Sequence, residues 1–149
     1  MTHSITTTGS CRCGAVAFEL RAEPIITTAC HCTGCQKMTA SAFSLTALVL
    51  AEHFVLTRGT PVTGGLRGAT RHLFCPDCLT WVFTRPDGND AVIGVRSTLL
   101  ENPERFRPFM ETWTSEKLSW AATGAAHSFE RFPEPHEYAA LAEKYRVRP

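Results

Sequence analysis

Apolar and polar residues alternate along several short stretches of the chain. Between residues 15 and 20, Val16, Phe18 and Leu20 alternate with Ala17 and Glu19, which is the period of a strand with one buried face. Similar runs rich in β-branched and aromatic residues occupy 42–50, 53–57, 71–74, 79–84 and 91–95. Short polar or glycine-containing segments separate these runs. The pattern predicts a mainly β domain built from antiparallel strands.

Two segments carry additional local signals. Asp87 and Gly88 lie between two predicted strands, and glycine adopts a positive φ without a Cβ clash, so the pair predicts a hairpin over 79–95. Near the C-terminus, after two prolines, apolar and aromatic residues recur at helical spacing: Tyr138, Leu141, Ala142 and Tyr145. This spacing predicts one short amphipathic helix.

The composition is that of one ordinary domain. The chain has 149 residues, of which 44% are hydrophobic and 19% are charged, which is typical of a single compact domain. Fifteen Lys and Arg against fourteen Asp and Glu give a net charge of +1 and a pI near 7.6, so a dedicated nucleic-acid binder is not indicated. We expect residues 1–8 to form a flexible N-terminus and residues 9–149 to form a single domain.

Targeting and membrane segments are not predicted. The first ten residues lack the basic start and apolar stretch of a signal peptide. The longest apolar run, 42–51, is far shorter than the ~20 residues that span a bilayer. We therefore expect a cytoplasmic protein with no membrane partner. In that reducing compartment, seven cysteines favour metal binding over a disulfide framework.

The cysteines fall into three groups: Cys11 and Cys13, then Cys30, Cys32 and Cys35, then Cys75 and Cys78. Thiolates one or two residues apart reach a single ion from a tight turn. A structural zinc site has four protein ligands, whereas a catalytic zinc keeps three and leaves the fourth position for water or substrate. The spacing favours one site formed by the first and last groups and a second site formed by the triplet.

Other interpretations of the cysteines remain open at this point. The last pair could join two thiols of the triplet, although the remaining thiols would then be stranded far apart. His31 lies between two proposed ligands, but in an extended segment it points away from Cys30 and Cys32, so we favour a partly exposed histidine outside the ligand set. Buried free thiols, or a redox pair at Cys75 and Cys78, would leave most of the clustering unexplained.

The order of the groups resembles a known family. The chain reads GSCRCGAV at 9–16, CHCTGCQK at 30–37 and FCPDC at 74–78, which resembles the glutathione-dependent formaldehyde-activating (GFA) family that includes centromere protein V. Together the three motifs are specific. The resemblance covers the chain from about Gly9 to Trp120. One departure is Leu79, where the family usually has glycine, and this change affects the backbone geometry expected of the turn.

The resemblance implies a fold, a cofactor and a reaction. It implies a β-tent of small antiparallel sheets with two zinc ions per chain. The structural ligands would be Cys11, Cys13, Cys75 and Cys78, and the catalytic ligands would be Cys30, Cys32 and Cys35. It also implies a carbon–sulfur lyase that joins a small thiol, such as glutathione, to formaldehyde as S-hydroxymethylglutathione.

Substrate residues and an alternative function complete the expectations. Lys37, two residues beyond Cys35, is a candidate for binding a substrate carboxylate, although a solvated surface lysine is the simpler interpretation. Further basic candidates, among which no spacing argument selects one, are Arg58, Arg67, Arg71 and Arg96. The alternative function is a non-enzymatic zinc module that binds a protein or nucleic acid, which the absence of a clustered basic face disfavours.

Overall fold

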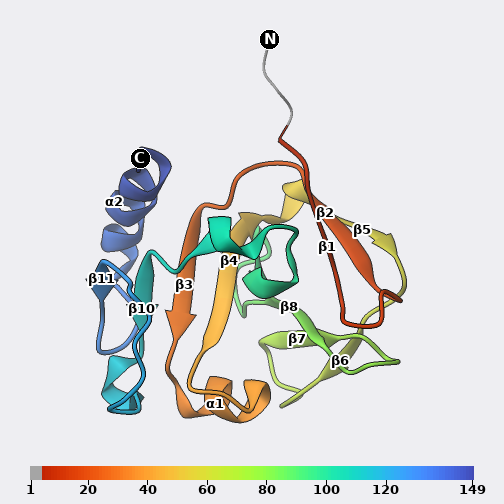
Figure 1. Cartoon of the computed structure of the whole chain (residues 1–149), viewed down its shortest axis with the longest axis horizontal. Helices are drawn as coiled ribbons and strands as arrows, with labels where there is room; N and C mark the ends of the chain where they lie inside the picture. Colours follow the sequence, from red (N-terminus) through yellow and green to blue (C-terminus); the bar gives the residue numbers. More distant parts are fainter. Residues whose placement is uncertain (1–4) are drawn as a thin grey trace.

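The computed structural model describes residues 5–149 and contains two β-sheets and two α-helices (Figure 1). A three-stranded sheet has the order β1-β2-β5, and an eight-stranded sheet has the order β11-β10-β3-β4-β9-β8-β7-β6. The strands are β1 Thr7–Ser10, β2 Ala17–Leu20, β3 Ile26–Cys30, β4 Ser44–Leu50, β5 Phe54–Arg58, β6 Val62–Gly64, β7 Arg71–Phe74, β8 Trp81–Arg85, β9 Val92–Arg96, β10 Met110–Thr112 and β11 His127–Ser128. The α-helices are α1 Thr33–Thr39 and α2 Pro135–Arg146, and short 3-10 turns cover Ala51–His53, Ser97–Leu99, Pro103–Phe106 and Thr114–Glu116.

The predicted mainly β fold is confirmed, and each of the six predicted runs contains a strand. Pairing is not wholly antiparallel, however, because β10 runs parallel to both β3 and β11. The large sheet is therefore mixed. These parallel strands are only two to three residues long, too short to give a periodic hydrophobic pattern.

The predicted hairpin over 79–95 is confirmed by β8 and β9. Phe83 pairs with Val95 and Thr84 with Gly94 in antiparallel register. Gly88, at the tip, has a φ of 70°, the conformation for which glycine was expected there. The hairpin lies in the sheet between β4 and β7, and Arg96, the last residue of β9, pairs with Thr46 of β4.

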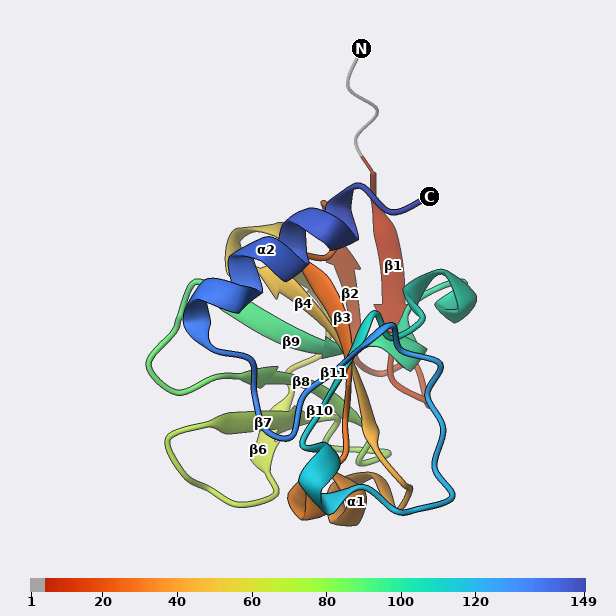
Figure 2. The ribbon, with the colours of Figure 1, turned by 90° about the vertical axis from the view of Figure 1, so that its left-hand side faces the viewer.

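The predicted C-terminal helix is α2, which lies across the end of the large sheet beside β3 (Figure 2). Its first turn has a capping box between Glu134 and Glu137, which satisfies free backbone donors. Leu141 and Tyr145 are buried and pack with Ile26 of β3 and Met110 of β10 in a small core cluster. A larger cluster lies between the two sheets and includes Val16, Phe18, Phe54, Phe83 and Val95.

The N-terminal end of the domain differs from expectation. Thr7 and Thr8, which the sequence places in the flexible segment 1–8, belong to β1 and pair with Leu20 and Glu19 of β2. Residues 1–4 of that segment lie outside the described residues. Among the residues described, no helix is both long enough and apolar enough to span a bilayer.

Candidate metal centre

Four cysteine thiols from two distant turns meet at one point. Cys11 and Cys13 lie in the turn between β1 and β2, and Cys75 and Cys78 lie in the turn between β7 and β8. The four sulfur atoms all lie within 4.8 Å of one another. Sγ of Cys13 is 3.6 Å from Sγ of Cys11 and 3.8 Å from Sγ of Cys75. Four sulfurs placed tetrahedrally at ~2.3 Å from one ion would be about 3.8 Å apart, so this four-thiol cluster fits a metal ion.

The backbone of both turns supports thiolate sulfurs. The amide N–H of Val16 donates to Sγ of Cys11, and the amide of Cys78 is directed at Sγ of Cys75. Thr80 also lies against the cluster, because its hydroxyl is 3.1 Å from Sγ of Cys78. Hydrogen bonds from the Thr80 hydroxyl and backbone lower the pKa of Cys78 to about 5. A sulfur that accepts hydrogen bonds in this way is suited to the ionised form that binds metal.

Leu79 lies in the left-handed region of backbone conformation, which favours glycine. Its φ is 59°, and its N–H donates to the carbonyl oxygen of Cys75 at 3.0 Å, while the N–H of Cys75 bonds to Thr80. The turn therefore closes with a leucine in the left-handed region. The side chain is 70% exposed, so no packing contact compensates for the strained backbone.

The remaining three thiols form a second cluster, the thiol triplet, at the end of β3. Cys30 is the last residue of that strand, Cys32 is the N-cap of α1, and Cys35 lies in the first turns of α1. Their sulfur atoms also lie within 4.8 Å of one another. The N–H of Cys35 donates to Sγ of Cys32 at 3.2 Å. This capping bond explains why a helix begins here, although none was predicted.

The three thiols of the triplet oppose one another's ionisation. Hydrogen bonds from Cys32 and then Cys35 lower the pKa of Cys30 to about 3. The same bonds raise the pKa of Cys35, because its own proton is shared with Cys30. The thiolate of Cys30 therefore forms readily, and its negative charge disfavours ionisation of the other two thiols. A divalent cation among the three sulfurs removes this conflict, so the donor set fits a metal ion.

Two buried hydroxyls flank Cys30 without partners of their own. Ser44 of β4 and Thr112 of β10 are both paired with Cys30 in the sheet, one on each side. Their side-chain oxygens are buried and make no hydrogen bond among residues 5–149. Buried hydroxyls normally have partners. Both hydroxyls lie near enough to the triplet to lower thiol pKa values there.

Glu111 of β10 forms a buried polar cluster behind the triplet. It is 6% exposed, and its carboxylate accepts hydrogen bonds from His31 Nε2 at 2.9 Å, Ser128 Oγ at 2.7 Å, Thr123 Oγ1 at 2.8 Å and Lys117 Nζ at 3.2 Å. Burial alone would raise its pKa, but these four donors lower it to about 2. The carboxylate is therefore ionised at neutral pH.

His31 is fully buried, so the expectation of a partly exposed histidine is wrong. Its ring points to Glu111 and stacks edge-on against Phe43, away from the triplet, and it belongs to neither group of possible ligands. The reason is the parallel strand β10, which places Glu111 one position from the residue paired with Cys30. By fixing His31, this contact holds the backbone between Cys30 and Cys32.

A hollow of about 380 Å³ opens beside the triplet. Cys30 and Cys35 line it, together with His72, Trp81 and Arg96. Its size is within the range of small-molecule sites. His72 Nδ1 lies 2.9 Å from the Thr84 hydroxyl, and burial, followed by the positive charge of Arg96, lowers its pKa. His72 is therefore neutral at pH 7.

Lys37 does not face this hollow. It lies in the last turn of α1 and lines a separate hollow with Trp120. Sequence reasoning proposed Lys37 because it is close to Cys35 along the chain, but a helix turns successive side chains to different faces. The basic side chain that does line the hollow is Arg96, and His72 was not considered because no local motif marks it.

These features define a mainly β protein with two all-cysteine clusters that could each hold a metal ion. The family model described as glutathione-dependent formaldehyde-activating enzyme matches residues 6–116. The chain belongs to this family, as its cysteine motifs indicated.

A crystal structure of a Rhodobacter sphaeroides protein, determined in a structural genomics programme, has a similar fold. Its sequence is 26% identical, and the alignment covers 64% of this chain and 88% of that chain with a TM-score of 0.50. The comparison with curated proteins gives no match. Both positive comparisons support the fold and the family, and β11 and α2 lie outside the family match.

Proposed function

We propose that this protein is a zinc-dependent carbon–sulfur lyase that joins a small thiol, such as glutathione, to formaldehyde. The observation that carries the proposal is the thiol triplet, which offers three ligands where a closed structural site has four, and which lines a hollow. The family name supports the same reaction. The alternative interpretation, a non-enzymatic zinc module, gives no reason for an open ligand set beside a hollow.

The two clusters have different roles in this proposal. Cys30, Cys32 and Cys35 hold the catalytic zinc, and the four-thiol cluster of Cys11, Cys13, Cys75 and Cys78 holds the structural zinc. All seven donors are thiols, which suits zinc better than magnesium or calcium. The four-thiol cluster fastens the β1–β2 turn to the β7–β8 turn, whereas the triplet comes from one continuous segment.

The reaction balances without an oxidant or reductant. A carbon–sulfur bond forms between the thiol and formaldehyde, the C=O π electrons pass to oxygen, and the thiol proton ends on that oxygen as an alcohol. When bound, zinc lowers the pKa of a thiol and polarises a carbonyl. His72, neutral and lining the hollow, has one ring nitrogen free of a proton to take the thiol proton.

The chain's own residues also orient the reactants. Ser44 and Thr112 keep hydroxyls beside Cys30, where they hold the triplet in one arrangement. The Glu111 carboxylate fixes His31 and so the segment that carries all three thiols. Trp81 and other large side chains form the walls of the hollow. Holding both reactants in such a space converts a bimolecular step into one with favourable orientation.

Two measurements test the proposal. Native mass spectrometry of protein prepared without chelator should give two zinc ions per chain, and a stoichiometry of one would contradict the catalytic role of the triplet. Two-dimensional exchange NMR of glutathione and formaldehyde should show faster interconversion with the adduct when protein is present. The matched control is the Cys32→Ser variant, which should give only the uncatalysed rate.

Exchange at the buffer rate for both proteins would refute glutathione and formaldehyde as the reactants. In that case gel-shift and pull-down experiments would test the alternative, a zinc module that binds nucleic acid or protein. Binding of DNA that weakens steeply with salt would support the alternative.

A further inference from the structure

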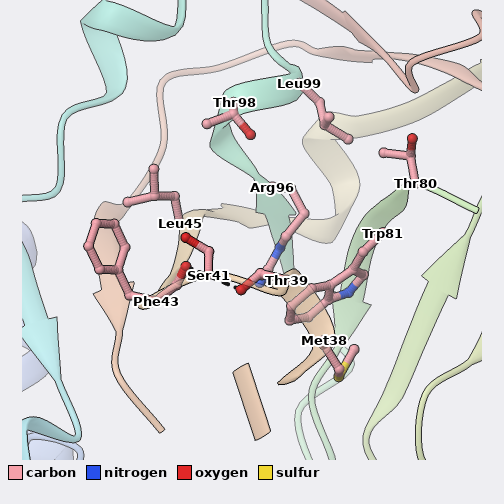
Figure 3. A pocket seen from close by; sticks show the side chains of 10 residues that line it. All are labelled: Met38, Thr39, Ser41, Phe43, Leu45, Thr80, Trp81, Arg96, Thr98 and Leu99. Carbon is pink, nitrogen blue, oxygen red and sulfur yellow. Dashed lines mark hydrogen bonds between the residues drawn. The ribbon is translucent and has the colours of Figure 1, made fainter. Parts of the chain in front are cut away.

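Arg96 is a buried cation with almost no partners. It is 8% exposed and lies at the end of β9. Figure 3 shows its side chain extending toward the indole of Trp81, and the guanidinium carbon lies 3.9 Å from the ring centroid. Stacking on the ring fixes the guanidinium plane, as is common for arginine on tryptophan. Arg96 forms no ion pair among the described residues.

The hydrogen-bond donors of Arg96 are mostly unused. A guanidinium has five N–H donors, but within residues 5–149 the one acceptor reached is the carbonyl oxygen of Gly94, at a long 3.4 Å from Nη2. The Nε atom is buried without a partner. Unsatisfied buried donors on a charged group are costly. Such a fixed, unsatisfied fork is suited to a planar carboxylate, which accepts two parallel hydrogen bonds.

A role as counter-charge to the triplet accounts for only part of this arrangement. Burial lowers the pKa of Arg96 to about 10, and the charges of Cys35 and Cys30 act in the opposite direction. The guanidinium and the thiols therefore attract one another across the hollow. However, no hydrogen bond joins Arg96 to either sulfur among the described residues, so its donors remain available to a molecule in the hollow.

One wall of the hollow is apolar and is formed by Ile26, Met110, Leu48, Phe132 and Tyr138. Polar side chains, among them Asp87 and several threonines, complete the lining. Leu48, Phe132 and Tyr138 also line a larger hollow of about 700 Å³ under α2, so apolar space continues beyond the triplet. Glutathione has two carboxylates, whereas Arg96 is the one lysine or arginine that lines the hollow.

The apolar wall comes partly from outside the region that defines the family. Phe132 and Tyr138 follow residue 116, where the family match ends. The family description therefore does not bear on this part of the hollow. Phe132 is 60% exposed and lines both hollows.

We propose that the hollow binds a thiol that carries one carboxylate and an apolar body. The carboxylate pairs with Arg96, and the apolar body packs against Leu48, Phe132 and Tyr138. Placement of the sulfur at the triplet rests on the proposed function. The recognition of an apolar carboxylate does not, because it depends only on Arg96 and the apolar wall.

Binding of thiol-free probes to the zinc-loaded protein tests this recognition by calorimetry at fixed salt. The probes are hydrocinnamate, hydrocinnamyl alcohol, which lacks the charge, and acetate, which lacks the apolar body. Hydrocinnamate should bind about tenfold or more tightly than either. Equal affinity for hydrocinnamate and the alcohol, or hydrocinnamate affinity weaker than ~10 mM, would overturn the proposal.

Three variants assign the effect to residues. Arg96→Met, which keeps the apolar stem, should lose the preference for the acid, whereas Arg96→Lys should keep part of it. Phe132→Ala should weaken hydrocinnamate binding several-fold and leave acetate unchanged. Arg85→Met is the matched control, because Arg85 also lies over an aromatic ring, that of Phe83, but does not line the hollow. It should bind all three probes as the wild type does.

Metal content separates recognition from charge balance. Arg96→Met should retain two zinc ions per chain, and loss of one ion would identify Arg96 as a counter-charge of the triplet and overturn its role in binding. α-Mercaptohydrocinnamate should bind more tightly than hydrocinnamate. If the two bind equally, sulfur placement and the proposed function both fail, while the carboxylate site stands.

Discussion

Replacement of Glu111 by glutamine measures how much the buried carboxylate stabilises the fold. Four side chains donate to it: His31, Lys117, Thr123 and Ser128. Against the opposing effect of burial, these bonds lower its pKa from 4.5 to about 2. Because one pKa unit corresponds to ~1.4 kcal/mol, this difference gives about 3 kcal/mol of stabilisation at neutral pH.

Glutamine has the shape of the native side chain without its charge. Its NH2 group would face donors where the carboxylate now accepts, so at least one buried donor loses its acceptor. We expect Glu111→Gln to lower the free energy of unfolding by about 3 kcal/mol. That is a large fraction of the ~5–15 kcal/mol that stabilises a typical domain.

Urea unfolding of the zinc-loaded proteins at neutral pH is the assay. The midpoint should fall by about 1–3 M with an unchanged slope. Glu101→Gln is the matched control, because the exposed Glu101 accepts one hydrogen bond, from Thr8. That variant should change stability by less than ~1 kcal/mol. A loss below ~1 kcal/mol for Glu111→Gln would refute the reasoning.

The pH dependence provides an independent check. Because the folded-state pKa of Glu111 is lowered, its stabilisation is fully present above pH 4.5 and is lost as the pH falls toward 2. The difference in stability between wild type and Glu111→Gln should therefore be constant from neutral pH to about 5 and shrink below that. A difference that persists unchanged at about pH 3 would show that the charge is not its source.

Further variants test the two cysteine clusters and the guanidinium of Arg96. Cys75→Ser should be insoluble or partly unfolded, because a structural zinc contributes ~10–16 kcal/mol in small zinc peptides, whereas Cys32→Ser should stay folded with one zinc. Circular dichroism melts and metal counts on both variants are the measurements. Equal unfolding of the two variants would contradict the structural and catalytic roles that we assign to the two clusters. Leu79→Gly should raise stability by about 0.5–1 kcal/mol in thermal melts, since it relieves a left-handed leucine, and an equal gain from Leu79→Ala would assign the effect to the exposed side chain instead. Gly94→Ala should reduce the acid preference measured by calorimetry, because its Cβ would lie 3.1 Å from Cγ2 of Thr46 and 3.4 Å from Nη2 of Arg96 and would crowd the strand beside the guanidinium. An unchanged preference would show that the site tolerates the extra methyl group.

Local patterns predicted those parts of the fold that depend on neighbours along the chain. Alternation located β2, helical spacing located α2, and the Asp-Gly turn located the β8–β9 hairpin. The helix α1 was missed, because it has seven residues and none of them is buried. Without a buried face, a helix has no apolar period to detect.

Contacts between distant segments could not be predicted in the same way. His31 and Glu111 are 80 positions apart, and their contact depends on a parallel strand of three residues. Arg96 was one of fifteen basic residues, and only the assembled sheet shows that it is buried beside the triplet. The thiol groups were detectable because metal ligands recur at short spacing.

The two cysteine clusters also differ in when they can form during synthesis. The triplet is complete as soon as Cys35 leaves the ribosome, whereas the four-thiol cluster must wait for Cys78, and its contact between Cys13 and Cys75 closes a loop of 62 positions. Closing so long a loop is slow and carries an entropy penalty that local folding does not. A nascent chain therefore presents the triplet to a metal ion first and the four-thiol cluster last. If zinc fills both clusters, as we propose, its supply limits the final joining of the two turns more than the early capture of metal.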